Sequence, residues 1–139
     1  LGDGVMAFWG ASEVQADHAE RAVAAARAVV DVIAEDNKRL RAKGGIPVRI
    51  RIGIHSGPAT VGNVGGPSRM SYTIVGDTVN SAERLCYLGK QAAPGDYDVG
   101  VLISGDTAAE LADTSGLTPF SEQVLRGRHR PTKIFRLAT

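Results

Sequence analysis

Strict alternation of apolar and polar residues over 47–55 restricts the fold of this chain more than any other feature. The apolar positions of this stretch are Val48, Ile50, Ile52 and Ile54, and the intervening ones are Arg49, Arg51, Gly53 and His55. A β-strand points successive side chains to opposite faces, so the pattern predicts a strand with one buried face. The chain must therefore build a sheet that has a core on at least one side.

The longest helix is expected to begin at Asp17. Asp17 and Glu20 have the spacing of a capping box, in which two side chains bind the free amides of a helix start. Lys43 followed by Gly44 is typical of a helix end. The apolar face between these limits consists of Ala22, Ala26, Val29, Ile33 and Leu40.

The rest of the chain mixes strands and helices without regular alternation. Apolar runs predict strands at 5–9, 59–64, 72–75, 101–104, 122–126 and 133–137, with helices at 77–88 and 106–112. Asp77 and Asp106 are the expected N-caps of these two helices. The pattern favours an α+β fold with a mostly antiparallel sheet. A length of 139 residues fits a single domain over 1–139.

Composition excludes several classes of function. The formal net charge is +1, which gives no general attraction to nucleic acid or to an anionic membrane. No apolar run approaches the length of a membrane span, so we expect no direct membrane contact from this segment. Cys86 is the one cysteine, which rules out an internal disulfide and is compatible with a reducing compartment.

The stretch 69–85, RMSYTIVGDTVNSAERL, carries the strongest chemical signal. It predicts a short strand, a Gly-Asp turn and a helix that bears Asn80 and Arg84. Residues four apart lie on one face of a helix, so the amide and the guanidinium point the same way. Such a pair suits the binding of a sugar oxygen together with a developing phosphate charge.

Five segments in order closely resemble the class III nucleotide cyclases, which convert ATP or GTP to a cyclic 3′,5′-monophosphate. They are GDGVMAFWGA, DHAERAV, RIRIGIHSGPATVGNVG, RMSYTIVGDTVNSAERL and RGRHRPTKIFRL. The resemblance is greatest to bacterial adenylyl cyclases. It implies a ferredoxin-like, palm-type domain whose sheet is flanked by helices. The family domain begins earlier than Leu1, so this chain is expected to lack its N-terminal strand-helix segment and to be inactive alone.

The resemblance also assigns roles to individual residues. Asp3 matches an aspartate that binds catalytic metal, and the family uses two divalent cations, Mg²⁺ or Mn²⁺. Asn80 and Arg84 match the residues that bind the ribose and stabilise the pentavalent phosphate, and both are the expected catalytic residues. Thr73 matches a position that reads the purine, while Arg126 stands where the family often has a lysine that holds the terminal phosphates.

The family pattern further implies a homodimer with active sites shared across the interface. Metal aspartates come from one protomer, whereas residues such as Thr73 and Arg84 come from the other. Threonine at position 73 favours ATP over GTP. The lysine that would read adenine with it, and a second metal aspartate, are expected upstream of Leu1. The need for a nucleoside triphosphate indicates a cytoplasmic site, in a larger or membrane-attached protein.

Other interpretations of the same residues stay open. Asp3 also fits an ordinary turn, Thr73 a strand residue, and Arg126 a solvated basic hairpin. Asn80 and Arg84 also fit a solvated helix face. At the level of function, the alternatives are a guanylyl cyclase and a catalytically silent nucleotide-binding or regulatory dimerisation module. A diguanylate cyclase is disfavoured because its Gly-Gly-Asp/Glu-Glu-Phe turn is absent.

Overall fold

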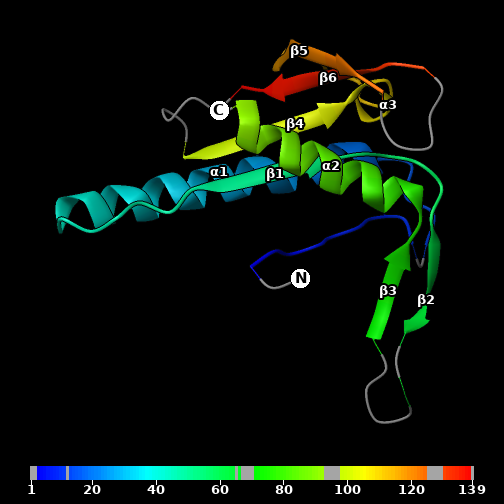
Figure 1. Cartoon of the computed structure of the whole chain (residues 1–139), viewed down its shortest axis with the longest axis horizontal. Coiled ribbons are helices and arrows are strands. Elements are labelled where there is room, and N and C mark those ends of the chain that lie inside the picture. Colours follow the sequence, from blue (N-terminus) through cyan, green and yellow to red (C-terminus); the bar gives the residue numbers. More distant parts are fainter. Residues whose placement is uncertain are drawn as a thin grey trace.

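The computed structural model describes residues 3–11, 13–64, 66, 71–92, 98–124 and 130–138. Its main sheet has four strands in the order β1-β4-β6-β5, namely β1 (Ile50–Ile54), β4 (Val99–Ser104), β6 (Thr132–Leu137) and β5 (Leu117–Gln123). β1 and β4 are parallel, while β4–β6 and β6–β5 are antiparallel. A separate antiparallel hairpin joins β2 (Thr60–Val64) to β3 (Ser71–Val75) and projects away from the sheet (Figure 1).

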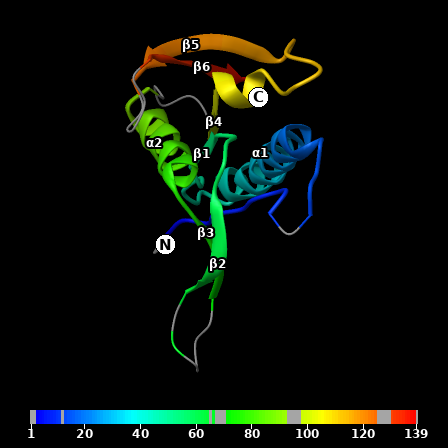
Figure 2. The ribbon, with the colours of Figure 1, turned by 90° about the vertical axis from the view of Figure 1, so that its right-hand side faces the viewer.

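Helices cover both faces of the main sheet. They are α1 (His18–Ala42), α2 (Asp77–Ala92) and the short α3 (Gly105–Ala108). On β4, Val101 and Ile103 belong to the core cluster that includes α1, whereas Leu102 packs with Leu85 and Leu88 of α2. α1 and α2 consequently lie on opposite sides of the strands (Figure 2). The predicted α+β class, with a mostly antiparallel sheet between helices, is confirmed.

The predicted strand at 5–9 is wrong. Residues 4–8 have no regular secondary structure, and Val5 is 95% exposed. This segment runs apart from both sheets (Figures 1 and 2). A strand persists only where a neighbour accepts and donates its ladder hydrogen bonds, and no described strand lies beside this segment. Apolar sequence alone does not supply that neighbour.

Two predicted caps are also corrected. α1 does follow Asp17, but the Asp17 carboxylate accepts a hydrogen bond from Arg21 Nε at 2.9 Å and caps no amide. α3 begins earlier than expected because Ser104, and not Asp106, is its N-cap. The Ser104 hydroxyl accepts from the Thr107 amide at 3.3 Å. At α1 the arginine takes the carboxylate away from the capping amides, and at α3 the cap lies two residues earlier than predicted.

The strand predicted at 122–126 is displaced toward the N-terminus and forms β5. It pairs with β6 over its whole length, with an irregularity between Pro119 and Ser121. Pro119 lies in a strand that is the last of the sheet, which is where a residue without an amide hydrogen is tolerated. The pairing with β6 thus extends a strand across a residue that normally ends one.

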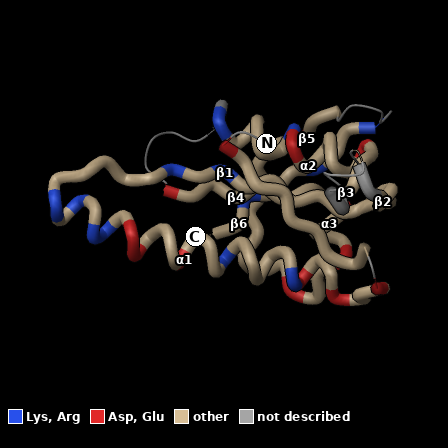
Figure 3. The backbone as a smooth tube through the Cα atoms, turned by 90° about the horizontal axis from the view of Figure 1, so that it is seen from below, with Lys and Arg blue, Asp and Glu red and all other residues tan. Residues whose placement is uncertain are grey.

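Polar contacts hold the C-terminal end of α1 against the residues that precede β1 and β4. Asn37 is completely buried, and its side chain exchanges two 2.7 Å hydrogen bonds with the amide and carbonyl of Val48. Arg41 binds both carboxylate oxygens of Asp98, at 3.0 and 2.5 Å. Arg39 and Arg41 lie in the last turn of α1, at the end where Figure 3 shows several basic residues, and Glu20 lies in its first turn, an order that suits the helix dipole.

The ion pair between Arg41 and Asp98 predicts a loss of stability in acid. Hydrogen bonds first from Arg41 and then from Asn37 lower the pKa of Asp98. A lowered pKa in the folded state stabilises the fold above the unfolded pKa, about 3.9, and this contribution disappears as the pH falls through the folded value. Asp98→Asn should therefore lower the urea midpoint at pH 7, with the deficit shrinking below about pH 4.

The matched control is Asp31→Asn, which alters an exposed aspartate of α1. It should leave the midpoint nearly unchanged at both pH values. If Asp98→Asn lowered the urea midpoint equally at pH 3 and pH 7, the charge of Asp98 would not stabilise the fold as predicted.

A glycine brings α2 onto β1. A Cβ atom built on Gly53 would lie 2.3 Å from the Ala82 carbonyl oxygen and 2.5 Å from the Cys86 amide nitrogen. Both are backbone atoms of α2, which cannot turn aside as a flexible side chain does. Gly53 therefore sets the distance between the helix and the sheet.

Gly53→Ala should push α2 away from β1. Overpacking of this kind typically costs about 1–3 kcal/mol, which urea unfolding would measure. Gly100→Ala is the matched control, since Gly100 lies on the neighbouring strand β4 and its added Cβ would meet nothing within 4 Å. Equal stability of the two variants would show that α2 does not depend on this contact.

Candidate active site

The candidate catalytic pair lies on the outer side of α2. The inner side is formed by Ser81, Leu85 and Leu88, which are all buried. Asn80 and Arg84 are exposed, and as residues four apart they lie one helical turn from each other. Within the described part of the chain, neither side chain has a hydrogen-bond or ion-pair partner. The structure thus presents an amide and a guanidinium together to solvent.

The start of α2 explains why this pair is available. β3 ends at Val75, and Gly76 turns the chain into the helix with φ +135°, a conformation that favours glycine. The Gly76 carbonyl accepts hydrogen bonds from the amides of Val79 and Asn80. Asp77 is the first residue of the helix, so it does not occupy the predicted capping position. Its negative charge still suits the first turn.

The two residues expected to bind the purine and the terminal phosphates are only partly placed. Thr73 lies in β3, where its backbone is paired with Gly62 of β2. The position of its side chain, and the whole of Arg126, lie outside the described residues. Their expected roles stay predictions.

Asp3, the expected metal ligand, lies at an exposed turn near the N-terminus. Among the described residues, no three His, Cys, Asp or Glu side chains come together as a metal site would require. Asp3 therefore does not form a complete metal centre with the described residues. A hollow of about 230 Å³ further along the N-terminal segment contains none of the candidate residues and is lined by Phe8, Trp9, Gly10, Ala11, Glu13 and Gln15.

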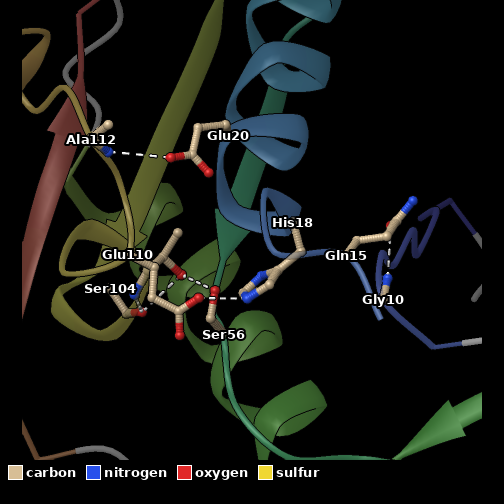
Figure 4. A network of polar contacts seen from close by, with 9 residues as sticks. Gly10, Gln15, His18, Glu20, Ser56, Ser104, Glu110 and Ala112 are labelled. Atoms are coloured by element: carbon tan, nitrogen blue, oxygen red, sulfur yellow. Dashed lines mark hydrogen bonds and ion pairs between the residues drawn. The ribbon is translucent and has the colours of Figure 1, made fainter. Parts of the chain in front are cut away.

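Polar contacts connect the start of α1 to the residues that follow α3 (Figure 4). His18 Nε2 lies 2.5 Å from a carboxylate oxygen of Glu110. One oxygen of Glu20 accepts a hydrogen bond from the Ala112 amide at 3.2 Å, whereas the other is buried and has no described partner. These contacts hold α1 against the sheet at the end opposite Asn37.

A second polar group lies where the parallel strands β1 and β4 end. His55 Nδ1 is 2.8 Å from the Ser104 hydroxyl, and the Ser56 hydroxyl is 2.9 Å from that of Thr107. Ser104 and Thr107 are completely buried. These contacts give His55 a structural role at the end of β1.

One residue that the sequence patterns did not single out, Thr78, lies in the first turn of α2. Its hydroxyl donates a 2.5 Å hydrogen bond to the carbonyl of Pro58, in the turn that leads to β2. A Cβ added to Gly57 would lie 2.7 Å from the same hydroxyl. The signal in the sequence is weak, because a threonine near a helix start is common and its partner is 20 positions away.

Chemically, the outer side of α2 suits an anionic sugar-containing ligand. A guanidinium presents several donors in a fixed plane to phosphate oxygens, and a neighbouring amide can both donate and accept. No helix among the described residues is long and apolar enough to cross a membrane.

Comparison with known proteins identifies the family. Residues 1–137 match the family described as "Adenylate and Guanylate cyclase catalytic domain". Adenylate cyclase 1 of Rhizobium meliloti is 39% identical over 134 residues, which cover 96% of this chain and 19% of that protein. The chain thus spans about one fifth of the length of this curated relative.

Solved structures agree with this match. The adenylyl cyclase CyaB from P. aeruginosa has a TM-score of 0.77 at 30% identity, covering 95% of this chain and 65% of its own. The guanylyl cyclase Cya2 has a TM-score of 0.72 at 27% identity, covering 93% and 62%. With its palm-type α+β fold and its exposed Asn80–Arg84 pair, this chain belongs to the family of class III adenylyl and guanylyl cyclase catalytic domains.

Proposed function

We propose that this domain belongs to an adenylyl cyclase, which converts ATP to 3′,5′-cyclic AMP and pyrophosphate. The observation that carries the proposal is the exposed Asn80–Arg84 pair on α2, in a chain of the cyclase family. Among the described residues, Arg84 has no hydrogen-bond or ion-pair partner, so its guanidinium is available to a ligand. A phosphate is a ligand that suits it.

The reaction explains the choice of these two side chains. The ribose 3′-hydroxyl loses its proton and its oxygen forms a bond to the α-phosphorus, while the bond from that phosphorus to the pyrophosphate oxygen breaks. Negative charge grows on the phosphate oxygens, where Arg84 stabilises the transition state. A single positioned donor of this kind is often worth about 3–4 kcal/mol. Asn80 binds the ribose and orients the 3′-hydroxyl.

Asp3 is proposed as one ligand of two divalent cations, Mg²⁺ or Mn²⁺. Such cations prefer carboxylate oxygens and neutralise charge on a triphosphate. Because Asp3 has no completed ligand set among the described residues, the remaining ligands have to come from elsewhere. Arg126 is proposed to hold the terminal phosphates.

The preference for ATP rests on Thr73 and on the relatives. The Rhizobium meliloti relative at 39% identity and the CyaB structure are both named adenylyl enzymes. The second candidate is guanylyl cyclase activity, because Cya2 shares the fold at 27% identity. Thr73 resembles the adenylyl subgroup and so favours the first candidate.

The site is proposed to be completed by a second copy of the chain. Metal ligands such as Asp3 and phosphate ligands such as Arg84 would then come from different protomers of a homodimer. The use of nucleoside triphosphate favours a cytoplasmic location for the reaction.

The first test compares cyclic nucleotide production from ATP and from GTP, with Mn²⁺, by the full-length protein. We expect cyclic AMP to be the main product.

Arg84→Ala should lower kcat by about 100-fold or more with a smaller change in KM, because the guanidinium acts mainly on the transition state. Lys90→Ala, another exposed basic residue of α2, is the matched control and should retain activity.

Different outcomes separate the alternatives. Cyclic GMP as the main product would replace the adenylyl assignment with the guanylyl one. Nucleotide binding without turnover, by a folded protein, would indicate a silent regulatory module. If Arg84→Ala lowered only the affinity for the nucleotide, Arg84 would not act on the transition state.

Shared sites predict complementation between inactive chains. Asp3→Ala and Arg84→Ala should each abolish most activity as homodimers. Mixed together, they should recover up to roughly a quarter of the parental rate, because half of the dimers are mixed and each mixed dimer has one intact site. The measurement is the cyclase rate of the mixture, with heterodimers verified by differently tagged chains. Verified heterodimers without activity would contradict sites shared in this way.

A further inference from the structure

The β2–β3 hairpin, called the arm below, leaves the body of the domain at two points. β3 enters α2 through Gly76, and β2 follows β1 through residues 55–59. Two perpendicular views show the arm projecting from the main sheet (Figures 1 and 2). Its direction relative to α2 therefore depends on contacts at its base, where Thr60 pairs with Val75.

The link through Gly76 does not fix that direction alone. Gly76 has φ +135°, and glycine rotates more freely than any other residue. Its neighbour across the base is Ala59, whose Cα would lie 3.8 Å from a Cβ at position 76. A single permissive residue between a strand and a helix forms a natural hinge.

Thr78 supplies a second link across the hinge. It lies two residues beyond Gly76, on α2, and its hydroxyl donates to the Pro58 carbonyl on the other side of the base. The absence of a side chain at Gly57 lets the hydroxyl approach. The turn is also held from the body, because Ser56 contacts the buried Thr107. The hydrogen bond of Thr78 thus ties α2 to a turn that is itself anchored.

We propose that Thr78 is a positioning residue that holds the arm, with Thr73, in fixed orientation to Asn80 and Arg84. The inference rests on the proposed function, in which the arm reads the purine while α2 holds the ribose and α-phosphate of one nucleotide. These parts must stay in register, since a displacement of about 1 Å can cost about 100-fold in rate. Thr78 keeps that register without touching the nucleotide.

The test uses three variants of the full-length protein. Thr78→Val keeps the shape and removes the hydroxyl, whereas Thr78→Ser keeps the hydroxyl. Thr118→Val is the matched control, because Thr118 also donates its hydroxyl to a backbone carbonyl, that of Arg136, at a distance from the arm. For each variant, hydrogen exchange of the amides at 60–62 and 77–79 is measured together with kcat and KM for ATP and GTP.

Thr78→Val should speed exchange at the base of the arm, lower kcat by up to about 100-fold, and reduce the preference for ATP over GTP. Thr78→Ser should regain most of both properties, and Thr118→Val should behave as the parent does. A loss of folding alone would leave the nucleotide preference of the remaining active molecules unchanged.

Three results would overturn the proposal. They are a parental nucleotide preference in Thr78→Val, an equal effect of Thr118→Val, and unchanged exchange at the base of the arm. Lack of turnover in the parent protein would refute the proposed function instead. The exchange measurement would then decide by itself whether Thr78 ties the arm to α2.

Discussion

The close contact between α2 and β1 at Gly53 is the constraint on which the candidate site depends. The backbone of the helix passes so near to Gly53 that a single Cβ would collide with Ala82 and Cys86. That contact sets the inner side of α2 against the sheet, where Leu85 and Leu88 are buried. Since the rotation of a helix fixes both of its sides at once, burial of the leucines places Asn80 and Arg84 outward. A packing constraint in the core thereby orients two functional groups at the surface.

The sequence predicts most of the regular elements because their patterns are local. The alternation around Ile52 and the helical spacing of Asn80 and Arg84 need no knowledge of distant residues. The strand expected at 5–9 fails because pairing depends on a neighbour. The Asp106 cap fails because the helix begins two residues earlier than predicted, with Ser104 as its cap. Strand order, and the bond between Thr78 and Pro58, depend on contacts between distant positions, which no periodicity records.

The outward position of Arg84 also limits what α2 can achieve alone. A guanidinium in water attracts a phosphate weakly, because the high dielectric constant of the solvent screens the charges. The same group stabilises a transition state strongly only where water is excluded and the donor is held in place. The packing of α2 fixes the backbone that carries Asn80 and Arg84, but the exposure of both side chains shows that the described residues do not exclude water from them. The proposed activity requires another surface over this side of α2, and in the proposed homodimer that surface would be the partner protomer that carries the metal ligands.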